Sequence, residues 1–457
     1  MAPKRIIRTT LDPNAWEGLC PALPAFKRPL YVATPCIGID GCGTALDALG
    51  VRYQANNVYD LEHRYQAYLT QHLGGNVQLH LGKKDGDLCQ LQLSDVERPV
   101  DLLVSGPPCP PWAGQGNHKG QHDHRADVFI VVMKVCIALI KVGDLHACCI
   151  ENVKGILAKI KGSTCSFMDQ ILHILRQECA EFQWGVHTLQ ASSYLLAQQR
   201  TRVFLRGVRK SDFPEFLSPD LPNCKLETLT EVMRKNLKDA QAHLKAMLQD
   251  GHLDAADLVV FPLDRADGKA YKRSYTTNLV PTLTTNNTYL FVVSLDFSRP
   301  NGQRKFLRFL HPSERMVLQG FSPSVLEGSS DTLRVKASGN AYPVPLMMAV
   351  LHGVLHQLAG GIPQKTKVVG SLLDQAVADA CHNFEVYMDE RSQGCSGGSP
   401  QTKAMKRPAA KAKAAKKAPK KKPAKGSSKT VKKAPKKKTP IQRRQYYKYR
   451  FLSSSSS

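Results

Sequence analysis

The stretch DLLVSGPPCPPW, residues 101–112, joins an apolar run to a loop rich in proline. The run Val100–Ser105 is predicted to form a strand, and Cys109 follows between prolines just beyond its carboxyl end. Proline fixes φ, so a loop of this kind holds its side chains in place. A thiol held there could act as a nucleophile. The alternative interpretation is a proline-rich turn with an incidental cysteine.

Outward from this stretch, strand-like and helix-like runs alternate from about Arg28 to Arg209. The expected strands are Leu30–Thr34, Tyr53–Tyr59, Val100–Ser105, Ala147–Ile150 and Arg202–Arg206. The expected helices are Thr44–Leu49, Leu61–Leu73, Ala126–Val142 and Ser166–Cys179. This alternation predicts an α/β fold, a parallel sheet covered by helices on both faces. Ligands of such sheets bind at the carboxyl ends of the strands.

Changes in composition divide the rest of the chain. Residues 1–27 are interpreted as a loosely ordered arm and 28–209 as the main domain. Residues 210–335, with a helical stretch near Leu226–Leu248 and a Thr- and Asn-rich region from Ser274 to Leu295, are predicted to form a second, smaller domain. Residues 336–392 are expected to return to the main domain through helices at Pro345–Leu358 and Val368–Met388. Residues 393–457, with their Lys/Ala/Pro repeats, are predicted to be disordered.

The basic charge belongs to that tail. From Gln401 onward there are 21 Lys and Arg and no acid, so the formal net charge of +25 leaves only +4 for residues 1–400. The thirteen cysteines contain no CxxC pair and form no ligand-spaced cluster, so we expect free thiols, a reducing compartment and no metal. The most apolar run, Val128–Ile140, contains Lys134 and is too short to cross a bilayer, and no signal peptide is expected.

Three further motifs carry polar groups. Cys149–Val153 is a strand that ends in Glu151 and Asn152, Gln198–Arg202 reads QQRTR, and Gly339–Pro345 is a turn before an apolar helix. Alone, each motif has a common structural explanation: a capping or solvated Glu, a solvated edge strand and a loop at a helix start.

In this order, however, the four motifs resemble those of the C5-cytosine methyltransferase family. That family has a Pro-Cys loop, Glu-Asn-Val, Gln-x-Arg-x-Arg, a variable recognition region and Gly-Asn-x, and these appear here over residues 30–358. Arg308–Phe321 also resembles the family's segment before the last motif. The resemblance implies a Rossmann-like sheet that binds S-adenosyl-L-methionine, with residues 28–209 as the catalytic domain and 210–335 as a small target-recognition domain.

The resemblance also implies roles for the catalytic residues. Cys109 would attack carbon 6 of a flipped cytosine in duplex DNA, and Glu151 would hydrogen-bond or protonate ring nitrogen 3. Arg200 would support the base and the developing charge, while Arg202 and Asn152 would organise the site. The loop Pro108–Asp123 is expected to close over the base.

The expected cofactor-binding residues lie on a Gly-rich turn at residues 36–43 and on the loops beside it. They are Cys36, Gly38, Gly41, Asp60, Asp87, Leu88, Pro107, Asn340 and Ala341. Asp60 would bind the ribose hydroxyls, with Asn57 as the alternative, and Asp87 and Leu88 would contact the adenine. Helix capping is the structural alternative for both aspartates.

Four positions depart from the family's pattern: Cys36 stands for Phe, Asp40 for Gly, Pro110 for Gln or Asn, and Ala113 for Ser or Thr. Asp40 would place a carboxylate near the charged end of the cofactor.

Two other functions stay open. A tRNA cytosine methyltransferase would carry a Cys-Phe-Thr motif in the second domain, but the one cysteine there, Cys224, precedes Lys225. A catalytically weak chromatin-binding protein on the same fold would explain Cys36, Asp40 and Pro110. The tail resembles linker-histone tails and nuclear import signals, so we expect it to bind the nucleic-acid backbone and the protein to lie in the nucleus. A merely solvated charge run is the alternative. The oligomeric state is not predicted.

Overall fold

The computed structural model describes residues 22–113, 123, 125–160, 164–194, 196, 198–212, 258–262, 280–285, 290–296, 303–309, 311–359 and 371–393 of the 457-residue chain. The expected helix near Leu226–Leu248, residues 114–122 of the loop after Cys109 and the basic tail lie outside these residues. The chain divides into two units, Met1–Gly397 and Gly398–Ser457, and the second is outside the described residues.

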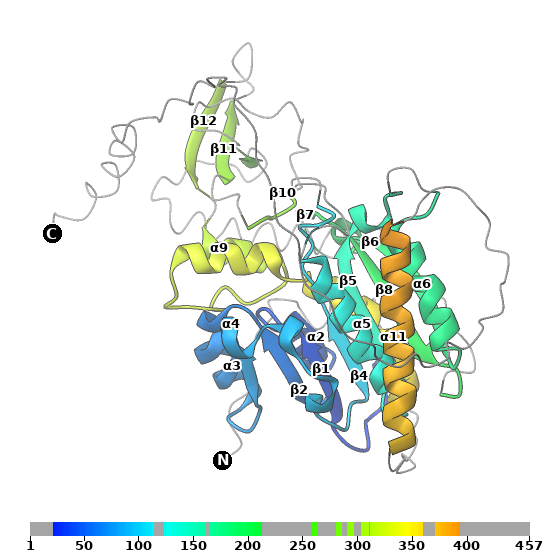
Figure 1. The fold of residues 1–457 in the computed structure, drawn as a ribbon. Helices are drawn as coiled ribbons and strands as arrows, with labels where there is room; N and C mark the ends of the chain where they lie inside the picture. Colours follow the sequence, from blue (N-terminus) through cyan, green and yellow to red (C-terminus); the bar gives the residue numbers. More distant parts are fainter. Residues whose placement is uncertain are drawn as a thin grey trace, which may run out of the picture. The chain divides into compact units, whose positions relative to one another are not determined.

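A seven-stranded sheet forms the centre of the first unit, with the order β3-β2-β1-β4-β5-β8-β6 (Figure 1). Its strands are β1 (Leu30–Pro35), β2 (Tyr53–Asp60), β3 (Leu79–Leu81), β4 (Leu102–Ser105), β5 (Ala147–Val153), β6 (Phe182–Gln190) and β8 (Thr201–Arg209). The pairs from β3 to β5 are parallel, but β8 runs antiparallel to both β5 and β6. The expectation of a parallel sheet is therefore wrong at this edge. Only residues 191–200 connect β6 to β8, which suits an antiparallel hairpin and is short for a parallel crossover.

Two strands, β3 and β6, were not expected from the sequence. β3 has only three residues, all partly exposed, and it lies at the edge of the sheet. β6 lies at the other edge, and several of its positions are partly exposed and polar. Edge strands lack the continuous apolar run that marks a fully buried strand such as β4, all four residues of which are buried.

Helices cover both faces of the sheet, as the alternation predicts (Figure 1). Apolar side chains of α2 (Gly41–Ala48), α3 (Gln66–Leu73) and α10 (Val344–Ala359) belong to one core cluster. Those of α5 (Ala126–Lys141), α6 (Phe167–Glu178) and α11 (Ser371–Gln393) belong to the other. The remaining α-helices of the described residues are α4 (Gly82–Asp85), α8 (Pro312–Val317) and α9 (Asp331–Asn340). Thus α10 returns the chain to the main core, as expected.

The local sequence explains where two of these helices begin. Ser166 caps α6 and shares a reciprocal capping box with Asp169, so α6 begins one residue after the expected position. α3 begins at Gln66 rather than at Leu61, because Asp60 accepts a hydrogen bond from the Glu62 amide and the chain first forms a short 3-10 turn.

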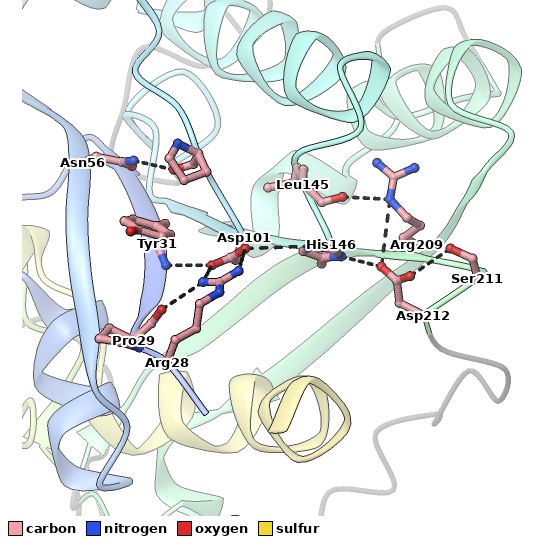
Figure 2. A network of polar contacts seen from close by, with 11 residues as sticks. Arg28, Pro29, Tyr31, Asn56, Asp101, Leu145, His146, Arg209, Ser211 and Asp212 are labelled. Carbon is pink, nitrogen blue, oxygen red and sulfur yellow. Dashed lines mark hydrogen bonds and ion pairs between the residues drawn. The ribbon is translucent and has the colours of Figure 1, made fainter. Parts of the chain in front are cut away.

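A buried network of charged groups holds the amino end of the sheet (Figure 2). The Asp101 carboxylate, just before β4, is fully buried. It accepts two hydrogen bonds from the Arg28 guanidinium, at 2.6 and 2.9 Å, and a third from the Tyr31 amide at 2.9 Å. A buried carboxylate is tolerated when its lone pairs are satisfied in this way, so the network anchors β1 to β4.

His146, just before β5, extends this network to the end of β8 (Figure 2). Its Nε2 atom lies 3.8 Å from Asp101 Oδ1, and its Nδ1 atom is hydrogen-bonded to Asp212. Burial opposes the charge on Asp212. Hydrogen bonds from His146 and Ser211 outweigh that effect, and the pKa of Asp212 lies below its usual range.

Residues of the expected second domain form a separate small sheet. Strand β11 (Leu290–Asp296) pairs antiparallel with β9 (Leu258–Pro262) and with β12 (Gln303–Phe309). Strand β10 (Val280–Pro281) pairs instead with β7 (Gln198–Gln199), which precedes β8 in the main domain. The segment between β9 and β11 is thereby attached directly to the Gln-x-Arg-x-Arg motif.

Candidate active site

The Pro-Cys loop follows the carboxyl end of β4 and is fixed by close packing. The Ser105 hydroxyl donates to the Pro35 carbonyl at 2.6 Å, and the Trp112 amide donates to the Cys109 carbonyl at 3.0 Å. The Trp112 ring packs against Phe129 at 5.8 Å and against Phe167 at 4.9 Å between ring centroids. Cys109 is thus held, partly exposed, on a loop anchored at both sides.

Two glycines make this packing possible. A Cβ atom on Gly106 would lie 2.4 Å from the Tyr342 ring, and one on Gly155 would lie 1.8 Å from the Trp112 carbonyl oxygen. Only glycine fits at either position without a shift of the backbone or the ring. Gly41, expected at the cofactor, has a similar role, because its Cβ would lie 2.7 Å from Tyr342 on the other side.

The thiol of Cys109 lies among charged groups of β5 and β8. Burial raises the pKa of Cys109 above its usual value, since it disfavours the thiolate. Arg202 and, to a smaller extent, Arg200 counter this effect, whereas Glu151 adds to it. The two arginines therefore favour the reactive form of the thiol.

Glu151 and Arg202 form a buried ion pair at the ends of neighbouring strands. Arg202 Nε lies 2.7 Å from Glu151 Oε1, and both side chains are less than a tenth exposed. The antiparallel pairing of β5 with β8 places Arg202 opposite Val153, two residues beyond the acid. The charged partner of Glu151 in the structure is therefore Arg202.

Arg200 instead binds backbone carbonyls. Its Nη1 atom donates to the Leu283 carbonyl at 2.9 Å, and Nη2 donates to Ala341 at 2.8 Å and to Gly339 at 3.2 Å. The side chain is fully buried, and burial lowers its pKa to about 9. Through these contacts Arg200 joins Leu283 to the end of α9 and the residue that follows it.

Asn152 is hydrogen-bonded at the end of β5. Its Nδ2 atom donates to the Pro107 carbonyl at 3.3 Å, and its Oδ1 atom accepts from the Val153 amide at 2.9 Å. The side chain is buried. Asn152 thus links the end of β5 to the Pro-Cys loop.

Sequence reasoning missed a second arginine at this junction. Arg315 of α8 donates to the Thr284 carbonyl at 2.8 Å and to the Ser338 hydroxyl at 3.0 Å. A Cβ on Gly339 would lie 2.4 Å from the Thr284 backbone, so glycine admits this segment. Arg315 does lie in the stretch Arg308–Phe321, which resembles a segment of the family. Its bond to a backbone carbonyl could not be predicted, because every residue type carries such a carbonyl.

On the cofactor side, Asp60 and Gly38 meet at the ends of β2 and β1. The Gly38 amide donates to Asp60 Oδ2 at 2.8 Å, and the Glu62 amide donates to Oδ1 at the same distance. Burial raises the pKa of Asp60. Gly38 has a φ of 57°, and nothing lies within 4 Å of the position of a Cβ, so open space adjoins the carboxylate. Next to it, Leu61 is 52% exposed.

The side chain of Asn57, the alternative ribose ligand, forms hydrogen bonds within the fold. It donates to the Glu97 carbonyl at 2.9 Å and accepts from the Glu97 amide at 2.8 Å, and it is buried. The geometry therefore favours Asp60 over Asn57 for contact with a ligand.

The other expected cofactor residues differ in their surroundings. Asp87 caps a 3-10 turn through the Cys89 amide at 3.1 Å, which matches the capping alternative, and Leu88 is buried. Pro107 is buried, and its carbonyl is held by Asn152. Cys36 has a φ of 60° and is partly exposed.

At the end of α9, Asn340 is exposed and Ala341 is buried. No group of three or more His, Cys, Asp or Glu that could hold a metal occurs among the described residues.

Asp40 does not face the open space beside Gly38. Its carboxylate is buried and caps α2 through the Gly43 amide, and it also pairs with His72 of α3. The carboxylate that we expected near the charged end of the cofactor is therefore engaged by groups of the fold. Asp40 has a φ of 55°, a left-handed conformation that Asp adopts more readily than most residues, and its side chain bonds locally.

The sequence is similar to those of known methyltransferases. The family described as C-5 cytosine-specific DNA methylase matches residues 36–356. The chain is 26% identical over 285 residues to the type II methyltransferase M.SsoII of Shigella sonnei, covering 60% of this chain and 68% of that protein. It is 22% identical over 298 residues to M.DsaV of Dactylococcopsis salina, covering 64% and 79%.

Among solved structures, the Dnmt2 methyltransferase of S. pombe aligns with a TM-score of 0.47 at 15% identity, over 72% of this chain and 99% of that chain. No helix among the described residues is long and apolar enough to cross a membrane. The family match spans every motif described above, from the Gly-rich turn to the helix after Gly339. The chain therefore belongs to the C-5 cytosine-specific DNA methylase family.

Proposed function

We propose that this protein transfers a methyl group from S-adenosyl-L-methionine to carbon 5 of cytosine in DNA, through a covalent adduct on Cys109. The observation that carries the proposal is the placement of Cys109 beside the buried Glu151–Arg202 ion pair. A thiol and a carboxyl group at the ends of the adjacent strands β4 and β5 can both contact one cytosine ring.

The residues present fit the steps that cytosine requires. Carbon 5 is a poor nucleophile until the Cys109 thiolate adds to carbon 6 and forms the sulfur–carbon bond. Glu151, in its protonated form, donates a hydrogen bond or its proton to ring nitrogen 3 as negative charge develops there, and Arg202 beside it holds the carboxyl group in place. Carbon 5 then accepts the methyl group. Loss of its proton to a base restores the double bond and expels the thiolate.

The cofactor residues fit an adenosyl ligand. S-Adenosylmethionine supplies an electrophilic methyl group when bound. The Asp60 carboxylate at the end of β2 would accept hydrogen bonds from ribose hydroxyls. Exposed Leu61 offers an apolar surface beside it, and the open side of Gly38 lets the backbone approach the ligand.

Duplex DNA is the substrate that the family match favours over tRNA. The Cys-Phe-Thr motif expected of a tRNA enzyme is absent from residues 210–335. The target base lies inside the stack, so the protein must flip it out, at a cost of a few kcal/mol. Closure of the loop after Cys109 over the base is part of this proposal, and residues 114–122 of that loop lie outside the described ones.

The alternative of a catalytically weak chromatin-binding protein loses one of its three grounds. Asp40 has a structural role in the β1–α2 loop, so it gives no reason to expect a damaged cofactor site. Cys36 and Pro110 remain as departures from the family.

The basic tail supports a further part of the proposal. Its 21 Lys and Arg without acidic residues would bind phosphates by counterion release, and its Lys-rich runs resemble nuclear import signals. We therefore propose a nuclear location. Deletion of residues 401–457 should weaken DNA binding and flatten its dependence on salt, while the methyl-transfer rate at saturating DNA stays the same.

A methyl-transfer assay tests the proposed function. The full chain, Cys109→Ala and Glu151→Gln are incubated with S-adenosylmethionine that carries a tritiated methyl group, and with duplex DNA or tRNA. We expect label in DNA at carbon 5 of cytosine with the wild type, none with Cys109→Ala and much less with Glu151→Gln. Label only in tRNA would move the substrate to RNA, and tight DNA binding without label would favour the chromatin-binding alternative.

A further inference from the structure

Asp40 is the centre of a buried polar cluster behind the Gly-rich turn. Its Oδ1 atom accepts from the Gly43 amide at 2.8 Å. Its Oδ2 atom lies 3.0 Å from His72 Nε2 and accepts from the Tyr53 hydroxyl at 3.3 Å. The side chains of Asp40 and His72 are 1% and 5% exposed. The carboxylate therefore joins α2, β2 and α3 at one point.

The neighbouring residues are shaped to admit this cluster. A Cβ atom on Gly43 would lie 2.1 Å both from the Asp40 carboxylate and from the Tyr53 hydroxyl, so glycine is required there. The ring of His72 stacks on that of Tyr68, with centroids 5.5 Å apart and planes 12° from parallel. Packing thus fixes the imidazole in the orientation that meets Asp40.

The cluster also borders the proposed cofactor site. The loop from Cys36 to Asp40 has its Ile37 amide bonded to the Tyr59 carbonyl at 3.0 Å and its Gly38 amide bonded to Asp60 at 2.8 Å. One end of the loop is thus tied to β2. The Asp40–His72 pair ties its other end to α3, the helix that follows Asp60 in the chain.

We propose that Asp40 and His72 are positioning residues that hold the β1–α2 loop, and with it the Gly38 amide, against Asp60, so that the pair sets the affinity for S-adenosylmethionine. This inference rests on the proposed function, since it assigns a role toward the proposed cofactor. It also explains the departure from the family's glycine: the carboxylate adds a link to α3 that glycine lacks.

Binding of the cofactor, measured by calorimetry with S-adenosylmethionine and with S-adenosylhomocysteine, tests the proposal on the full chain. Asp40→Gly restores the family's residue and suits a φ of 55°, so a loss of affinity cannot come from backbone strain at this position. His72→Leu removes the other partner, and His72→Gln keeps a donor at the place of Nε2. Gln71→Ala, at an exposed position of the same helix, is the matched control.

We expect Asp40→Gly and His72→Leu each to weaken binding about tenfold, because each leaves buried polar groups without their partner. The double variant should lose no more than either single one, since both remove the same link. His72→Gln should stay within about threefold of the wild type. The methyl-transfer rate at saturating cofactor should be unchanged, so the effect falls on KM and not on kcat.

Folded Asp40→Gly and His72→Leu variants with wild-type affinity, or losses that add in the double variant, would overturn the proposal. If Asp40→Gly does not fold, Asp40→Asn, which keeps an acceptor for Gly43, takes its place in the comparison. A wild-type protein that binds neither ligand would instead refute the proposed function, so the two failures are distinguishable.

Discussion

Replacing Arg202 by glutamine isolates the central interaction of the site. Arg202 Nε lies 2.7 Å from Glu151 Oε1, and both groups are buried. Glutamine keeps part of the volume and a neutral donor but removes the positive charge. The change therefore leaves a buried carboxyl group beside Cys109 without its cation.

The geometry sets the size of the effect. At 2.7 Å and an effective dielectric constant of about 20, the attraction between the two charges is roughly 6 kcal/mol before the cost of desolvation. Removing one partner of such a pair lowers the free energy of unfolding by about 3–5 kcal/mol. Arg202 is also the charge that most lowers the pKa of Cys109, so this pKa should rise further in the variant. We expect methyl transfer to slow by about 10²–10³.

Two measurements and two control variants separate these effects. Denaturant unfolding gives the stability, and the pH dependence of alkylation by iodoacetamide gives the pKa of Cys109. The double variant Glu151→Gln/Arg202→Gln has no unpaired charge, so it should recover part of the stability but none of the activity. Arg200→Lys should lower stability, because Arg200 binds backbone carbonyls. Its alkylation profile should change less than that of Arg202→Gln.

The proposed role of the Glu151–Arg202 ion pair would be refuted if Arg202→Gln matched the wild type in stability and in the alkylation of Cys109. It would also be refuted if the double variant were as destabilised as the sum of the two single variants, because the ion pair would then contribute nothing.

Three further predictions concern acidity and packing. Burial raises the pKa of Cys109, so its alkylation should still increase above pH 9, and a plateau near pH 7 would contradict this. The pKa of Asp212 is depressed in the folded protein, so its contribution to stability is present above the unfolded value of about 4 and is lost as the pH falls through the folded one. Asp212→Asn should therefore lower the neutral unfolding free energy by about 1–3 kcal/mol and flatten its acid dependence, and an unchanged acid slope would count against this. Gly155→Ala should cost about 1–3 kcal/mol and slow methyl transfer, because its Cβ would lie 1.8 Å from the Trp112 carbonyl. The control Gly353→Ala, in open space on α10, should do neither.

Patterns that depend on local sequence were readable without the structure. The apolar run before Cys109 became β4, the run before Glu151 became β5, and the periodic segment at Ala126–Val142 became α5. Most side chains of each of these elements are buried, so its sequence is largely apolar. The same patterns place Cys109 on the loop after β4 and Glu151 near the end of β5, at one edge of the sheet.

Features that depend on partners distant in the chain were not readable. Arg202 meets Glu151 because β8 pairs antiparallel with β5, whereas Arg200 meets Ala341, 141 residues further along the chain, because the end of α9 packs against it. From the sequence we expected Asp40 near the cofactor. Its partner His72 lies 32 residues away in the chain, and nothing in the sequence indicates that its ring points toward the carboxylate. Residue types limit which groups can interact, but strand direction and packing decide which of them meet.

The most direct test of the central claim is to trap the bond between Cys109 and cytosine. Duplex DNA that carries 5-fluorocytosine cannot lose its substituent from carbon 5 after methylation, so the adduct persists. The full chain is incubated with this DNA and S-adenosylmethionine, digested, and the peptides are examined by mass spectrometry. We expect a nucleotide adduct on the peptide that contains Cys109, and none in Cys109→Ala. Methylation of ordinary cytosine without any such adduct, or an adduct on another cysteine, would contradict it.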